Sequence, residues 1–219
     1  MRICNFLSLK TIVYSFIACF SAVIQLSATN NFDLVNLHTI NTRIQIEMRY
    51  ATTDNPLGVP LYPSAECYVV TEVAYKLNSV QRELEKIGYG LKVWDAYRPH
   101  NQQLRLSCDQ NASFDNINSC LYSLDHFNGN SRGTSVDVTL VCHDGSDLRM
   151  PTDFGCYSPG TARDCKWLSA NVYHHVQLLE KKMEQFGFIP SPSEWWHFDY
   201  RSESCYPVLD VSILELANL

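Results

Sequence analysis

The spacing of apolar and polar residues predicts two amphipathic helices. Between residues 70 and about 87, apolar side chains recur at intervals of three and four, and charged or amide side chains fill most other positions. The same spacing runs from about residue 169 to 186. Gly88 and Gly187 follow the two stretches, and glycine is common just after a helix ends. Each helix therefore presents one apolar face to a core.

Other segments have the residue pattern of β-strands, which is either strict alternation or enrichment in β-branched and aromatic residues. Four segments carry this signal: 44–50, 91–97, 135–141 and 195–200. The intervening segments 51–63 and 142–166 are rich in turn residues, and residues 101–128 are polar with only a weak helix signal. The chain is therefore predicted to have an α+β fold, in which a small central, mostly antiparallel sheet packs against helices.

The N-terminus has the pattern of a secretory signal. Arg2 and Lys10 precede a largely apolar run without charged residues, which ends at Ser27 and Ala28. We expect residues 1–28 to be a signal peptide and residues 29–219 to form a single domain, which predicts a periplasmic or secreted protein. If the segment is not cleaved, it would instead anchor the protein to a membrane.

Composition limits the class of partner. The chain has 17 Lys and Arg residues against 23 Asp and Glu residues, a formal net charge of -6, and its basic residues are not clustered. Binding to nucleic-acid phosphates needs such clusters, so a nucleic-acid partner is not expected. A small or neutral ligand suits this charge balance better.

Cysteine usage is consistent with export. Two of the nine cysteines lie in the predicted signal, and the remaining seven allow three disulfides and one free thiol. The close pairs Cys108/Cys120 and Cys156/Cys165 are the first candidates for bridges. Because no C-x-x-C pair is present, a zinc site made of cysteines is not expected.

Four side chains at or near predicted strands have the chemistry of a metal-assisted hydrolase. Asp137 and His197 are suitable zinc ligands, and Glu194, three residues before His197, can take a proton from a metal-bound water. Arg98 can stabilise the oxyanion formed on an attacked carbonyl. Simpler interpretations also exist, because Glu194 and His197 fit a salt-bridged strand pair and Arg98 fits an ion pair with Asp95.

Several motifs in a fixed order resemble a known family. They are Tyr50-Ala51-Thr52 with Asn55, Asp95-Ala96-Tyr97-Arg98-Pro99, Ser131-Arg132-Gly133 leading to Asp137-Val138-Thr139-Leu140, a weaker match at 150–154, and Glu194-Trp195-Trp196-His197. Spanning residues 46 to about 200, they resemble the VanX-type D-alanyl-D-alanine dipeptidases, zinc peptidases whose fold is shared with some peptidoglycan carboxypeptidases. The resemblance implies Zn²⁺ as cofactor, Asp137 and His197 as its ligands, Glu194 as general base and Arg98 as transition-state stabiliser.

The sequence departs from the family pattern at one metal position. The family has a histidine ligand before Ser-Arg-Gly, and this chain has Asn130 there. An asparagine amide oxygen is neutral and donates weakly, so zinc is expected to bind less tightly than with a third anionic or imidazole ligand. His126, four residues upstream, is a substitute if the loop folds back.

Three functions follow from these observations. The favoured one is zinc-dependent hydrolysis of the D-alanyl-D-alanine dipeptide to D-alanine. The second is a degenerate, zinc-poor homologue that binds a peptidoglycan-derived dipeptide or a protein partner. The third is a peptidoglycan carboxypeptidase or endopeptidase that acts on cell-wall substrates with the same residues. In the favoured case the partner is a small dipeptide substrate, with no nucleic acid, and with a membrane only if the N-terminal segment is uncleaved.

Overall fold

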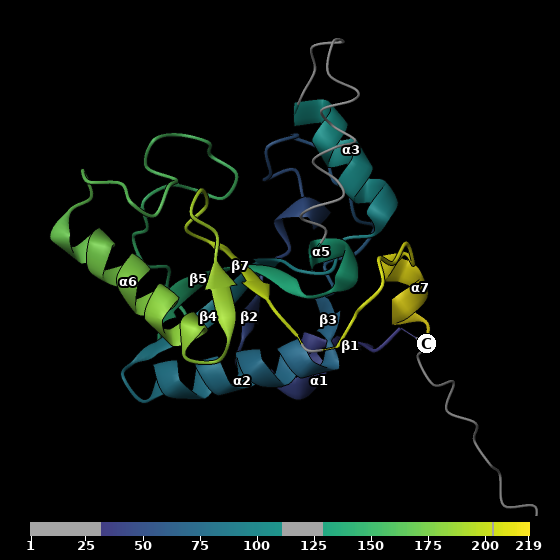
Figure 1. The fold of residues 1–219 in the computed structure, drawn as a ribbon, viewed down its shortest axis with the longest axis horizontal. Coiled ribbons are helices and arrows are strands. Elements are labelled where there is room, and N and C mark those ends of the chain that lie inside the picture. Colours follow the sequence, from purple (N-terminus) through teal and green to yellow (C-terminus); the bar gives the residue numbers. More distant parts are fainter. Residues whose placement is uncertain (1–31, 111–128, 203) are drawn as a thin grey trace, which may run out of the picture.

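A five-stranded sheet forms the centre of the protein (Figure 1). The computed structural model describes residues 32–110, 129–202 and 204–219. The strands of the sheet, in spatial order, are β2 (Gln45–Ile46), β4 (Tyr89–Asp95), β5 (Ser135–Cys142), β7 (His197–Tyr200) and β6 (Phe188–Pro190). Only the β2–β4 pair is parallel, and the other three pairs are antiparallel. The predicted α+β fold with a mostly antiparallel sheet is confirmed.

Two long helices, α2 (Thr71–Glu85) and α6 (Ala170–Glu184), lie side by side and pack against the sheet (Figure 1). Both agree with the predicted amphipathic segments to within a few residues. Their apolar stripes are buried, including Leu77 on α2 and Leu179 on α6. Because strand side chains alternate between faces, Val138 on β5 belongs to one face of the sheet and its neighbours in sequence to the other. Polar residues on that second face are thereby available for a site.

Shorter elements complete the fold. A separate two-stranded antiparallel sheet pairs β1 (Leu34–Asn36) with β3 (Tyr68–Val70). The other helices of the described residues are α1 (Leu37–Ile40), the 3-10 turn η1 (Arg49–Ala51), α3 (His100–Gln110), α5 (Gly129–Arg132) and α7 (Ile213–Ala217). Among the described residues, no helix is long and apolar enough to cross a membrane.

Three local expectations differ from the structure. The first predicted strand is observed only at Gln45–Ile46. The Glu47 N–H still donates to the Val93 carbonyl at 2.9 Å, and the chain then turns into η1. The last strand begins at His197, so the two tryptophans precede it. Residues 100–110 form helix α3. The sequence signal for this helix is weak because the segment is polar and its apolar stripe is poorly defined.

The expected disulfide between Cys156 and Cys165 is wrong, because both are free thiols. Each lies in its own turn, where the Cys156 N–H donates to Asp153 and the Cys165 N–H donates to Ala162. The thiols of Cys156 and Cys165 therefore lie in different turns and are not bonded to each other. The Cys108/Cys120 pair, His126 and the signal at residues 1–28 involve side chains or segments outside the described residues, and they stay predictions.

The buried face of α2 should carry a large part of the stability. Leu77 is fully buried, whereas the Tyr75 side chain on the same helix is 56% exposed. We expect Leu77→Ala to lower the free energy of unfolding by about 2–5 kcal/mol through lost burial and an unfilled cavity, and Tyr75→Ala to change it by about 0.5 kcal/mol or less. Urea denaturation followed by tryptophan fluorescence measures both. Equal effects of the two substitutions would contradict the assignment of α2 to the core.

Candidate active site

All the catalytic and metal-binding residues expected from the sequence that the structure describes line one cavity. It has a volume of about 460 Å³ and lies over the second face of the sheet, bounded by α3, α5, the loop at residues 154–157 and the β6–β7 hairpin. Residues on its wall include Arg98, Asn130, Asp137, Glu194 and His197. Residues that are far apart in the sequence are therefore brought together at one place.

Pairing between β5 and β7 sets the centre of the cavity. Asp137 lies opposite His197 in the antiparallel register, and Ser135 lies opposite Asp199. Since alternate residues of a strand share a face, all four side chains lie on the same side of the sheet. The His197 Nδ1 atom is 2.8 Å from Asp137 Oδ1, and its Nε2 atom is 3.4 Å from Asp199 Oδ1. The imidazole ring is held between two carboxylates.

This arrangement changes the protonation of His197. Burial lowers its pKa, but the hydrogen bonds to Asp137 and Asp199 and the charges of these carboxylates outweigh burial and raise the pKa to about 10. Without a metal ion, the ring is therefore an imidazolium near neutral pH. The buried Asp137 carboxylate has a cationic partner in that state.

Glu194 lies in the hairpin between β6 and β7, three residues before His197. Burial raises its pKa, and the charge of Asp137 raises it further, while the charge of His197 and a hydrogen bond from Tyr157 act in the opposite direction. A carboxyl group with a raised pKa is suited to take up and return a proton near neutral pH. Glu194 has the protonation properties of a general base.

Arg163, which no sequence motif indicated, holds the hairpin that carries this base. Arg163 donates from Nε to the Ser191 carbonyl at 2.6 Å and from Nη2 to the His197 carbonyl at 3.0 Å. Its guanidinium lies 4.3 Å from the centre of the Phe198 ring and pairs with Glu180 of α6 at 3.3 Å. Both ends of the hairpin are thereby fixed to the rest of the domain.

Arg98 is buried, with 6% of its surface exposed. Its Nε donates to Asp95 at 3.1 Å, Nη2 also donates to Asp95, and Nη1 donates to Gln103 of α3. Tyr62 supports Asp95 with a hydrogen bond of 2.9 Å, and the Tyr50 ring centre lies 4.9 Å from the guanidinium carbon. The ion pair with Asp95 anticipated as the simpler interpretation is therefore present.

That ion pair leaves part of the guanidinium available. Arginine has five N–H donors, and in the described part of the chain one remains on each Nη atom of Arg98 after the bonds to Asp95 and Gln103 are made. Because Arg98 also lines the cavity, these donors can bind a carboxylate or a developing oxyanion. Pairing with Asp95 orients the arginine and does not remove it from the site.

The Asn130 side chain is fixed in one orientation. Its Nδ2 donates to the Ala96 carbonyl at 3.0 Å. The main-chain carbonyl of Asn130 accepts from the Arg98 and Gly133 N–H groups at 3.1 and 3.0 Å. The Oδ1 atom lies on the other edge of the amide, and Asn130 lines the cavity. Across residues 32–110, 129–202 and 204–219, no group of three His, Cys, Asp or Glu side chains is arranged to hold a metal ion.

Aromatic side chains wall the cavity. The ring centre of Phe154 lies 5.4 Å from that of Tyr50, 5.7 Å from Trp94 and 5.8 Å from Trp196. Trp196 lines the cavity, whereas Trp195 is fully buried and donates from its indole nitrogen to Thr152. Trp195 therefore belongs to the core and Trp196 to the cavity wall, and both precede strand β7.

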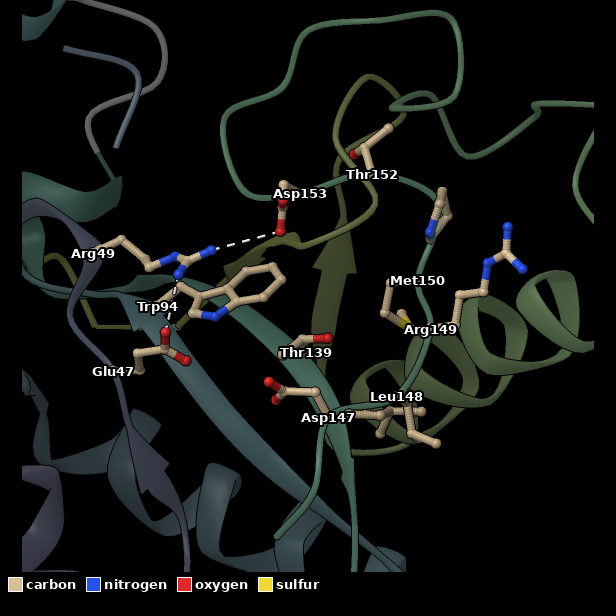
Figure 2. A pocket seen from close by; sticks show the side chains of 12 residues that line it. Glu47, Arg49, Trp94, Thr139, Asp147, Leu148, Arg149, Met150, Thr152 and Asp153 are labelled. Carbon is tan, nitrogen blue, oxygen red and sulfur yellow. Dashed lines mark hydrogen bonds and ion pairs between the residues drawn. The ribbon is translucent and has the colours of Figure 1, made fainter. Parts of the chain in front are cut away.

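A second cavity, of about 410 Å³, lies next to Trp94 (Figure 2). Its charged side chains largely pair with one another: Arg49 lies 2.9 Å from Glu47 and 3.6 Å from Asp153. None of the catalytic or metal-binding residues expected from the sequence lines this cavity. The cavity that contains Asp137 and His197 is therefore the candidate active site.

Known proteins share this sequence pattern. A family profile described as D-Ala-D-Ala dipeptidase matches residues 30–217. The D-alanyl-D-alanine dipeptidase of Escherichia coli strain K12 is 30% identical over 185 residues, covering 81% of this chain and 89% of the relative. The protein of the same name from Enterococcus faecalis is 27% identical over 180 residues, covering 75% and 89%.

Two solved structures are weakly similar to this chain. The LdcB LD-carboxypeptidase has a TM-score of 0.41 at 17% identity and covers 77% of this chain and 67% of its own. VanYB in complex with D-alanine-D-alanine has a TM-score of 0.38 at 15% identity, covering 73% and 78%. The family assignment depends on the sequence match, which extends over nearly all of the described residues. This chain belongs to the D-Ala-D-Ala dipeptidase family, which is a family of peptide hydrolases.

Proposed function

We propose that this protein is a zinc-dependent dipeptidase that hydrolyses D-alanyl-D-alanine to two molecules of D-alanine, outside the cytoplasm. The observation that supports it best is the meeting of Arg98, Asp137, Glu194 and His197 in one cavity. Membership of the family supports the reaction type, and the names of the relatives support the substrate. The secretory pattern of residues 1–28 supports the location.

The donor atoms of the cavity fit zinc with two strong ligands and one weak one. Asp137 Oδ1 and His197 Nδ1 are donors of the types that zinc prefers, and they already lie 2.8 Å apart. The third donor is the Oδ1 atom of Asn130, which is neutral and is held in place by the Ala96 contact. When bound there, zinc would lower the pKa of a water molecule and polarise the substrate carbonyl.

The two remaining groups supply acid–base and electrostatic catalysis. Glu194 takes a proton from the attacking water and returns it to the amine that leaves, for which its raised pKa is suited. Arg98 offers one N–H from each Nη atom to the oxygen on which negative charge develops. Both groups are held by neighbouring side chains, so little ordering is required during the reaction.

The cavity volume of about 460 Å³ suits a ligand of the size of a dipeptide. Phe154 and Trp196 form a packed aromatic wall, and Tyr157 lies on the cavity wall and hydrogen-bonds Glu194.

One observation favours a second function, in which the protein binds a peptidoglycan-derived dipeptide without cleaving it. His197 is already paired with carboxylates through both ring nitrogens, and position 130 supplies only an amide. A stable site without metal is therefore possible, since the imidazolium neutralises Asp137. Zinc must displace the proton on Nδ1 in order to bind.

Catalysis is tested by release of D-alanine from the dipeptide. With excess zinc, the mature protein is expected to release D-alanine, and Glu194→Gln to reduce kcat by about 10²–10⁴-fold because the proton acceptor is lost. Glu184→Gln, at an exposed position of α6, is the matched control and should retain full activity. Asn130→His should raise activity at limiting zinc. If only the Asn130→His variant released D-alanine, the wild-type protein would be the binder and not the enzyme.

The charge state of His197 is tested in chelator-treated protein. Its pKa is raised from 6.5 to about 10 in the folded protein, so protonation of the ring favours the folded state. This stabilisation is complete below about pH 6.5 and is lost as the pH rises to about 10. Urea unfolding across this range should show a steeper fall in the free energy of unfolding for the wild type than for His197→Gln. Parallel curves would show that the ring is not held as an imidazolium.

A further inference from the structure

The imidazole of His197 contacts two carboxylates, and only one of them has a role in the proposed function. Asp137 faces Nδ1 at 2.8 Å, and Asp199 faces Nε2 at 3.4 Å. The two ring nitrogens point to different sides of the ring, so an ion held by Nδ1 and Asp137 is not on the Asp199 side. Asp199 is therefore placed to bind the ring and not the metal.

Asp199 is itself held in a defined position. It pairs with Ser135 in the β5–β7 register, and the Ser135 hydroxyl donates to the same oxygen that faces His197. The chain also passes close by at Gly129, where a Cβ atom would lie 2.9 Å from Asp199 Oδ1 and closer still to the Ser135 hydroxyl. A larger residue at 129 would displace this pair. Gly129 directly precedes Asn130, so the Asp199 carboxylate packs against the segment that carries the weak zinc donor.

We propose that Asp199 is a positioning residue that fixes His197 for metal binding. By accepting the Nε2–H hydrogen bond, it selects, once the Nδ1 proton is displaced, the tautomer whose Nδ1 lone pair is free to bind a metal ion beside Asp137. A carboxylate on the second nitrogen also makes the imidazole a more basic ligand. This inference depends on the proposed zinc site.

The contact between Asp199 and His197 compensates for the weak zinc donor at position 130. Asn130 supplies no charge, so the affinity of the site depends on how well Asp137 and His197 bind. The side chain of Asp199 is 38% exposed, and direct attraction between its charge and the metal is screened by solvent. Its main effect is therefore exerted through the orientation and basicity of His197. Removal of such a partner typically weakens metal affinity about 10–100-fold.

Zinc affinity, measured by competition with a chromophoric chelator, tests the assignment. Asp199→Ala should bind zinc about 10–100-fold more weakly than the wild type. Asp199→Asn, which keeps an oxygen that can accept the Nε2–H, should lose less. Asp144→Ala is the matched control, because it removes a carboxylate from an exposed turn beyond β5 and should leave affinity unchanged. Circular dichroism of each variant verifies folding.

A second readout separates positioning from a general structural effect. In ¹⁵N spectra of the zinc-loaded wild type, His197 should be protonated at Nε2 and not at Nδ1, and Asp199→Ala should exchange that proton faster. Equal zinc affinity and equal exchange in the wild type and Asp199→Ala would overturn the assignment and leave the proposed function intact.

The proposed function fails in a different way. If the wild type binds no zinc at any accessible concentration, the zinc-dependent enzyme is excluded, whatever the role of Asp199. The Asn130→His background then decides the role of Asp199, because it restores a third strong ligand. In that background Asp199→Ala should still weaken zinc affinity by a similar factor, and no change would overturn the assignment.

Discussion

The pairing of Asp137 with His197 across β5 and β7 is the interaction on which the site depends. Both residues are mostly buried, so the Asp137 carboxylate needs either the imidazolium of His197 or a metal ion beside it. The antiparallel register fixes their separation before any ligand arrives. Glu194, three residues before His197 in the sequence, lies in the β6–β7 hairpin and lines the same cavity. Any shift of β7 by one residue would turn the whole set to the other face of the sheet.

Neighbouring side chains hold the other groups of the site in fixed positions around this pair. Arg163 closes the hairpin by binding the carbonyls at its two ends. Asp95 and Gln103 hold Arg98 so that its remaining donors can reach the cavity. Preorganisation of this kind lowers the cost of ordering in the transition state. The exception is Asn130, which is firmly held but is a poor zinc ligand.

The sequence predicted the parts of the fold with strong local patterns. Helices α2 and α6 follow the spacing of their apolar residues, and β5 follows its β-branched composition. The grouping of Arg98 and Asp137 with the Glu-Trp-Trp-His segment was also foreseen, because motifs in a fixed order carry that information. Asp199 could have been found in the same way, since it lies two residues after His197 on a predicted strand and so shares its face.

Other features could not be read from the sequence. Arg163 lies in a turn-rich loop, and its contacts with Ser191 and Glu180 exist only after α6 packs against the hairpin. Cysteine spacing suggested a bridge between Cys156 and Cys165 that the separate turns do not form, because closeness in sequence does not set the direction of a side chain. The anchoring of the Asn130 amide by Ala96 is likewise a tertiary contact.

The zinc content of the purified mature protein tests the central claim most directly. The protein would be saturated with zinc, freed of loosely bound metal by gel filtration and analysed for metal per chain, with Asn130→His treated in parallel. If two strong donors and one amide form a working site, the wild type retains about one zinc per chain, as expected of a catalytic zinc centre. Retention by Asn130→His together with no zinc in the wild type would contradict the claim.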